Sequence, residues 1–132
     1  MINFFSKYKI IFYLINIGLI FFYLYPGSLL GWIIYDDIKA QPRLTQDFIN
    51  ISSNHLYVFI IISIIGLFTY VKPQEFKFLI LYLIFSSIFL EILHLFIEAR
   101  TFQFSDLLGN LLGVIIVIII HFILKNYGFF KN

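Results

Sequence analysis

The chain has 132 residues, of which 61% are hydrophobic and 12% are charged, and its mean hydropathy is +0.98. Soluble domains carry about a quarter charged residues, so this composition argues against a soluble enzyme and a disordered segment. Nine basic and seven acidic side chains leave no broad basic surface for nucleic acid, and the absence of cysteine excludes disulfides. The sequence therefore predicts an integral membrane protein with a single domain over residues 1–132.

Four apolar stretches are long enough, or nearly so, to cross a bilayer as helices of about 20 residues. They cover residues 8–25, 55–71, 76–97 and 106–124. Because lipid offers the backbone no hydrogen-bond partners, we expect helices rather than strands, despite the many isoleucine and phenylalanine residues. The first stretch could be a signal peptide, but no small-x-small cleavage site follows it. We therefore expect an all-α fold, an integral membrane four-helix bundle.

The connection over residues 26–54 is the one long segment between these stretches. Leu29 to Tyr35 is apolar but too short to cross, and its Trp32 and Tyr35 favour a position at the membrane interface. The connection ends in Ser52-Ser53-Asn54, residue types that are good N-caps for the following helix.

Lysine and arginine are distributed unequally between the two ends of the predicted bundle. Three of them (Lys39, Arg43 and Arg100) lie at the end with the long connection. Six lie at the end with the chain termini: Lys7, Lys9, Lys72, Lys77, Lys125 and Lys131. Because cytoplasmic loops of membrane proteins are enriched in these residues, we expect both termini to be cytoplasmic and the long connection to face outward.

Polar residues concentrate between positions 91 and 110, although a charged group inside a bilayer costs roughly 2.5–3.5 kcal/mol. Glu91, His94 and Glu98 follow one another at spacings of three and four, which places them on one face of the third predicted helix. A protonated Glu91, hydrogen-bonded to its neighbour, is the structural interpretation. A functional site is favoured, because intramembrane carboxylates beside an imidazole are costly to retain.

The fourth predicted helix opens with Ser105 as a candidate N-cap and with Asp106 in its first turn, where a carboxylate complements the helix dipole. Asn110 lies one turn deeper on the same face. Gly109 and Gly113 form a G-x-x-x-G pattern, which permits another helix to approach closely. We assign these two glycines a structural role.

A tight turn between the third and fourth helices predicts that they form the antiparallel core pair of the bundle. Counting outward from the turn gives the positions that should lie level with one another. The expected pairs are Glu98 with Asp106, His94 with Asn110, and Glu91 with Gly113.

Arg100 in this turn is expected to pair with Asp106 first and with Glu98 second, either as a structural staple or as part of a ligand site. His55, at the outer start of the second helix, either completes the cluster or is an ordinary interfacial histidine.

The run from Glu91 to Gly113 resembles the VanZ-like family. That family has a Glu late in a membrane helix, an Arg in the next turn, and Asp-x-x-x-Asn-x-x-Gly opening the last helix. The matching residues are Glu91, Arg100, Asp106, Asn110 and Gly113, and His55 matches a histidine that opens the preceding helix. His94 stands where the family usually has Gln, and Ile51 and Ser52 stand where it usually has Asp-Lys. The role of the family's Asp-Lys pair is therefore absent from this chain or is taken by other residues, and Asp47 is one candidate.

The resemblance implies a small, multi-pass protein of the bacterial cytoplasmic (inner) membrane and a role in the cell envelope. The family's namesake is associated with low-level resistance to the glycopeptide antibiotic teicoplanin. The family's molecular activity is not established, so the resemblance implies no particular reaction.

We hypothesise a cell-envelope protein that binds an amphiphilic ligand, such as a membrane lipid, a lipid-linked wall precursor or a lipoglycopeptide, in an outward-facing polar cavity. The expected ligand-binding residues are His55, Glu91, His94, Glu98, Arg100, Asp106 and Asn110. One alternative is an intramembrane enzyme with Glu91 and His94 as catalytic acid–base groups, although no nucleophile motif supports it. The other alternative is a non-catalytic accessory or scaffold subunit.

Glu91-x-x-His94 has the spacing of half a di-iron carboxylate site, but the sequence has no second copy of this motif. We therefore expect no metal and no cofactor. Four helices are few for a transporter unless the chain forms an oligomer, which the sequence leaves open.

Overall fold

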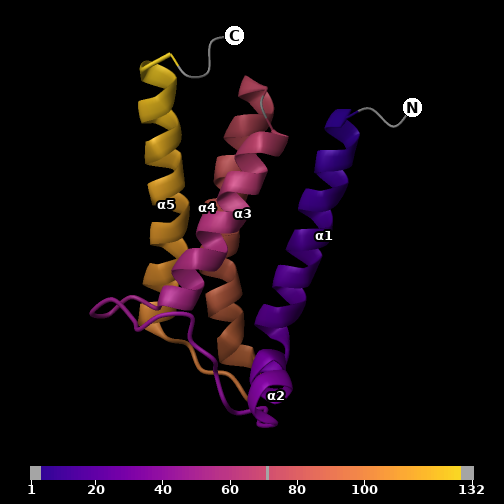
Figure 1. Cartoon of the computed structure of the whole chain (residues 1–132), viewed down its shortest axis with the longest axis vertical. Helices are drawn as coiled ribbons and strands as arrows, with labels where there is room; N and C mark the ends of the chain where they lie inside the picture. Colours follow the sequence, from indigo (N-terminus) through magenta and orange to yellow (C-terminus); the bar gives the residue numbers. More distant parts are fainter. Residues whose placement is uncertain (1–3, 71, 129–132) are drawn as a thin grey trace.

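A computed structural model describes residues 4–70 and 72–128, without the side chains of residues 4–7. Within these residues the fold is all-α, as predicted, with one isolated β-bridge between Phe48 and Ile51 and no strand (Figure 1). The helices are α1 (Phe4–Leu24), α2 (Leu29–Tyr35), α3 (Ser53–Thr69), α4 (Pro73–Leu93), the 3₁₀ helix η1 (His94–Phe96) and α5 (Phe104–Asn126). Val71, Lys131 and the side chain of Lys7, on which predictions above depend, lie outside this description.

Two continuous helical segments are long and apolar enough to cross a membrane, namely Pro73–Phe96 and Phe104–Asn126. α1 and α2 together pass the same test, but they are bent by 79° at the break between them. α3 has 17 residues, which span about 25 Å and fall short of a hydrocarbon core of about 30 Å. The described chain therefore has two or three candidate spans, and four crossings remain a prediction.

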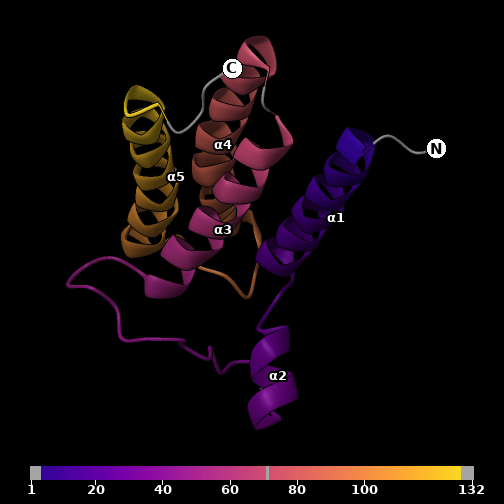
Figure 2. The same cartoon turned by 45° about the horizontal axis from the view of Figure 1, so that its top comes forward.

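The helices alternate in direction, so that α1 and α4 run toward α2 while α3 and α5 run back toward the chain termini (Figures 1 and 2). α3 contacts both α1 and α5, and α4 packs against all three. The most extensive contact joins the parallel helices α3 and α5. The prediction that α4 and α5 form the core pair is therefore wrong, although these two helices do pack side by side.

The two glycines of the G-x-x-x-G pattern explain why α3 lies so close to α5. A Cβ atom added at Gly109 would be 2.6 Å from the carbonyl oxygen of Ser52, and one added at Gly113 would be 2.7 Å from that of Leu56. Both glycines therefore lie at a helix contact. Their neighbour is α3, whereas the level pairing of Glu91 with Gly113 placed Gly113 opposite α4.

Buried apolar side chains from the long helices meet in one cluster, which includes Phe12, Phe59, Leu83 and Val114. Large apolar side chains also point outward along the helices; Phe78, for example, is 73% exposed. A helix that is apolar on its outer face as well is typical of a lipid environment. The arrangement is thus compatible with membrane insertion.

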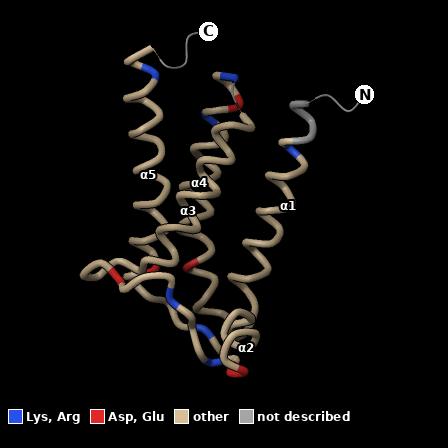
Figure 3. Tube along the Cα trace, viewed as in Figure 1, with Lys and Arg blue, Asp and Glu red and all other residues tan. Residues whose placement is uncertain are grey.

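The charged residues of the helices lie mainly near the two ends of the bundle, apart from a few at the polar site described below (Figure 3). At the end that carries the termini, Lys9 Nζ lies 3.0 Å from Glu75 Oε1. At the other end, Arg43 Nη1 lies 3.3 Å from Asp47 Oδ2 in the long connection. The long uncharged middle of each helix fits a hydrocarbon layer between these two ends.

Candidate functional site

The long connection fixes the start of α3, where His55 lies. Asp47 Oδ1 accepts a hydrogen bond from the backbone N–H of Ser53 at 3.1 Å. Asn54 donates to the carbonyl of Pro42 at 2.7 Å. Ser52 is the N-cap residue, but its side chain makes no capping bond. The cap predicted from Ser52-Ser53-Asn54 is therefore supplied by Asp47, which lies outside the helix.

α4 ends earlier than predicted. The sequence places Glu98 on the helical face of Glu91 and His94, but the helix ends at Leu93 and only the short turn η1 follows. Glu98 is consequently exposed in the connection to α5. The prediction that all three residues share one helical face is wrong, because the helix does not extend as far as Glu98.

Glu91 is fully buried and binds the start of α5. Its Oε1 accepts a hydrogen bond from the backbone N–H of Gln103 at 2.9 Å. Gln103 is the N-cap residue of α5, which corrects the assignment of Ser105 to that position. Since the connection is longer than a tight turn, Glu91 lies level with the first turn of α5 and not with Gly113. A carboxylate there also complements the positive end of the helix dipole.

His94 connects α4 to α1. Its Nδ1 lies 3.3 Å from Glu91 Oε1, and its Nε2 lies 2.9 Å from the carbonyl oxygen of Tyr23. The imidazole also stacks on the Tyr23 ring, with centroids 5.6 Å apart and an interplanar angle of 18°. Each ring nitrogen therefore faces an oxygen, and a doubly protonated ring can donate to both.

Asn110 lies at the centre of a buried network that joins four helices. Its amide nitrogen donates to the carbonyl of Ser87 in α4 at 3.1 Å, which contradicts the predicted level pairing with His94. Its Oδ1 accepts from the hydroxyl of Tyr23 in α1 at 2.5 Å. The same oxygen lies 3.1 Å from Nδ1 of His55 in α3, and Tyr23 Oη lies 2.6 Å from that nitrogen.

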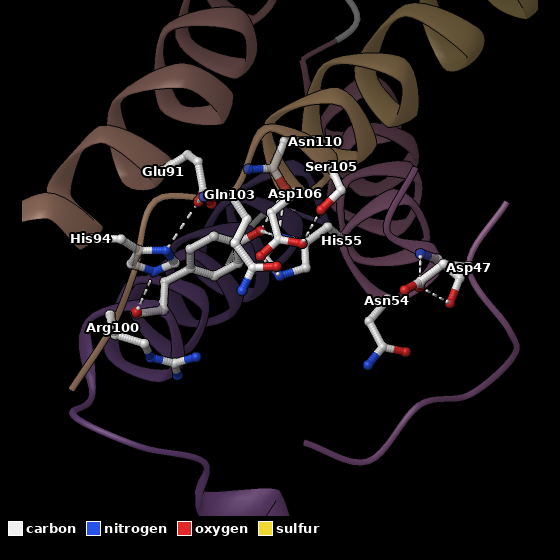
Figure 4. Close-up of polar contacts among 12 residues, drawn as sticks. Asp47, Asn54, His55, Glu91, His94, Arg100, Gln103, Ser105, Asp106 and Asn110 are labelled. Atoms are coloured by element: carbon white, nitrogen blue, oxygen red, sulfur yellow. Dashed lines mark hydrogen bonds and ion pairs between the residues drawn. The ribbon is translucent and has the colours of Figure 1, made fainter. Parts of the chain in front are cut away.

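His55 also faces the first turn of α5. Its Nε2 lies 3.4 Å from Asp106 Oδ2, and both side chains are mostly buried. One oxygen of Glu91 belongs to the same group, because ligand-type atoms of His55, Glu91 and Asp106 all lie within 4.8 Å of one another. Figure 4 shows these side chains approaching one another from three helices, with Asn110 beside them. The structure thus brings together five predicted site residues, namely His55, Glu91, His94, Asp106 and Asn110.

Arg100 does not form the predicted pair with Asp106 or Glu98. Its guanidinium donates instead to three backbone carbonyls at the end of α1 and just beyond it. The distances are 3.2 Å from Nε to Tyr25 O, 3.3 Å from Nη2 to Phe22 O and 2.6 Å from Nη2 to Gly27 O. A cation at a helix C-terminus satisfies orphan carbonyls and complements the dipole, so the backbone outcompetes the acids.

Burial lowers the pKa of the Arg100 guanidinium, and the negative charge of Asp106 acts in the opposite direction. An arginine nevertheless remains charged at neutral pH. The turn therefore places a permanent positive charge beside the polar cluster.

Replacing Arg100 by lysine is expected to lower the free energy of unfolding by about 1–2 kcal/mol, because an ammonium cannot reproduce the planar fork that reaches three carbonyls. Thermal unfolding in detergent measures this change. Arg43→Lys is the matched control, since its ion pair with Asp47 is exposed and should change stability by less than about 0.5 kcal/mol. Equal effects of the two exchanges would contradict the capping role of Arg100.

A cavity of about 470 Å³ lies between α1, α2 and α3. Its apolar part is lined by side chains such as Ile15, Leu19 and Phe22. Its polar lining residues are Ser28, Asn54, His55, His94 and Arg100, together with the hydroxyl-bearing Tyr23. Of the expected ligand-binding residues, His55, His94 and Arg100 line the cavity, whereas Glu91, Glu98, Asp106 and Asn110 do not.

In comparisons with known proteins, no family model, curated protein or solved structure matched the chain.

Proposed function

We propose that this chain is a VanZ-like protein of the bacterial cytoplasmic membrane that binds an amphiphile of the cell envelope. The resemblance of the run from Glu91 to Gly113 supports the family. The cavity supports the ligand class, namely a lipid, a lipid-linked wall precursor or a lipoglycopeptide. In this proposal the bound molecule places its chain along α1 and its head near the polar cluster.

The single observation that carries this proposal is the change in character along the cavity lining. Ile15 and Leu19 lie in the middle of α1 and offer a surface suited to an acyl or prenyl chain. His55 and Arg100 lie at the end of the bundle that carries α2. Since the Arg100 side chain is held in place by backbone carbonyls, its charge is preorganised for an acidic head such as a phosphate.

The distribution of basic residues supports an outward position for this end of the bundle. Lys9, Lys72 and Lys125 lie at the end with the chain termini. The positive-inside rule therefore favours cytoplasmic termini and a cavity that opens toward the outer leaflet. A ligand of the cell wall or an extracellular lipoglycopeptide would reach the cavity from that side.

Filling the cavity should abolish binding without disturbing the helices. Gly18 lines the cavity, and a Cβ atom added there would meet no other atom within 4 Å. Gly18→Phe should therefore place its ring in the cavity while the backbone stays where it is. We expect native mass spectrometry of the purified protein, mixed with a single species of phosphatidylglycerol, to show one retained lipid in the wild type and about tenfold less in the variant.

Ile17→Phe is the matched control, because Ile17 is the neighbouring residue but is 64% exposed on the outer face of α1. This exchange adds the same ring on the side of α1 away from the cavity. Equal lipid retention in the two variants and the wild type would show that the retained lipid is annular, and would refute the cavity as its binding site.

A further inference from the structure

Three metal-ligating side chains converge from three different helices at the loop end of the bundle. His55 comes from α3, Glu91 from α4 and Asp106 from α5. One nitrogen and two carboxylate oxygens from these residues lie within 4.8 Å of one another. Atoms bound to one Zn²⁺ at about 2.1 Å are roughly 3–3.6 Å apart, so small side-chain rotations would close this set around an ion.

The hydrogen bonds of His55 fix which of its nitrogens faces this group. Tyr23 donates its hydroxyl proton to Asn110 Oδ1. His55 Nδ1 lies 2.6 Å from Tyr23 Oη and 3.1 Å from Asn110 Oδ1, and with the Tyr23 proton on Asn110 the tautomer that fits these two contacts carries its proton on Nδ1. In a neutral ring the lone pair is consequently on Nε2, which faces Asp106 at 3.4 Å. The two acceptor atoms repel one another unless a proton, a water molecule or a metal ion lies between them.

Glu91 provides an independent observation. The residue is fully buried, and its Oε1 accepts the bond from Gln103, but its Oε2 has no hydrogen-bond partner. A buried carboxylate oxygen without a partner costs about 1–3 kcal/mol or more, so an occupant that this oxygen can bind is to be expected. The unpartnered oxygen belongs to the side chain that, with His55 and Asp106, surrounds the space between the three helices.

We propose that His55, Glu91 and Asp106 bind a divalent metal ion of the Zn²⁺ or Mn²⁺ type. An imidazole and two carboxylates form a ligand set with mixed nitrogen and oxygen donors, which these ions accept. Three protein ligands leave a coordination position for water or a ligand group. Tyr23 and Asn110 act as positioning residues, because they hold the His55 ring in the orientation that directs Nε2 to the ion.

This metal site differs from the one considered from the sequence. The spacing Glu91-x-x-His94 predicts two ligands on one helical face, but both nitrogens of His94 are occupied by Glu91 and by the carbonyl of Tyr23. His55 takes the place of His94, and Asp106 completes the set. A second Glu-x-x-His copy is therefore not needed, and the site does not depend on the proposed amphiphile.

Metal binding by the purified full chain, with any affinity tag removed and bound ions stripped by a chelator, tests the proposal. We expect isothermal titration with Zn²⁺ to show one site per chain, and Co²⁺ to give the visible absorption of a protein-bound ion. Glu91→Gln and Asp106→Asn preserve side-chain shape but remove a ligand charge, and each should weaken Zn²⁺ binding by about a hundredfold. Tyr23→Phe should weaken it by about tenfold, as loss of a positioning bond does.

His121→Gln is the matched control, because it removes a histidine near the other end of α5, and its Zn²⁺ affinity should equal that of the wild type. Thermal unfolding of the metal-free proteins shows whether each variant is folded, and added Zn²⁺ should raise the unfolding temperature of the wild type but not that of Asp106→Asn. A wild type that binds no Zn²⁺, or an affinity unchanged in both Glu91→Gln and Asp106→Asn, would overturn the site. In that case a proton or a water molecule satisfies the contact between His55 and Asp106.

Discussion

Gly113→Ala is expected to lower the free energy of unfolding by about 2–3 kcal/mol, although it adds a single methyl group. The new Cβ would be 2.7 Å from the carbonyl oxygen of Leu56 and 2.8 Å from Phe59 Cβ. Neither atom is the end of a flexible side chain, so the backbones of α3 and α5 must move apart at this contact. Unfolding in mixed micelles of a mild detergent and dodecyl sulfate, followed by circular dichroism, measures the change.

Gly18→Ala is the matched control, because it makes the same exchange in a helix where the added Cβ has open space around it. Alanine is the better helix former by about 1 kcal/mol, so stability should stay the same or rise. The two exchanges should thus change the free energy of unfolding in different directions. If Gly113→Ala were as stable as Gly18→Ala, the close approach of α3 to α5 would be wrong.

The helices could be predicted from the sequence because their signal is simple. A long apolar segment whose backbone must bond internally forms a helix, and all four predicted stretches lie in helices apart from a few end residues. The short helix α2 also coincides with the apolar segment Leu29–Tyr35. The pairing of the helices could not be predicted from the sequence. Apolar residues surround each helix, so no polar face indicates which neighbour it packs against.

The errors in the site have a common origin in the connection between α4 and α5. No Pro or Gly between Leu93 and Gln103 marks the end of α4, so the sequence pattern predicts a helix that continues past Leu93. A longer helix implies a shorter turn before α5 and therefore shifts the positions at which the two helices are expected to face one another. This shift explains why the predicted level pairing of His94 with Asn110 is wrong. It also left Arg100 close to the acids, whereas the longer connection carries it to the end of α1.

Tyr23 is the residue of the polar network that the sequence does not predict. A tyrosine near the end of a membrane helix ordinarily lies at the interface with its hydroxyl in water, so its position gave no reason to select it. Here the residue is only 8% exposed and bonds Asn110. Asn110 is recognisable because an amide inside an apolar stretch needs partners, and His55 because it opens the second helix at the same end of the bundle. Tyr23 is the partner that they share.

Asn110→Ala is expected to lower the free energy of unfolding by about 2–4 kcal/mol, because it removes the bonds that link α5 to Tyr23 and Ser87 and leaves a small cavity. Asn16→Ala is the matched control. Asn16 is also buried in an apolar helix, but it donates to its own helix at Phe12 O and accepts from one other helix through Tyr82. Asn16→Ala should lower the free energy of unfolding by no more than half as much as Asn110→Ala.

The bond between Tyr23 and Asn110 can be isolated by a double-mutant cycle. Tyr23→Phe alone should cost about 1 kcal/mol, and the same exchange should cost much less in a chain that already carries Asn110→Ala, which gives a coupling energy of about 0.6–1.5 kcal/mol. Unfolding in mixed micelles provides all four values. Strictly additive effects would show that the two side chains do not interact, and the orientation of His55, which depends on both, would lose its physical basis. Coupling within this range would instead establish that the bond between these two side chains links α1 to α5 at the end of the bundle where the site lies.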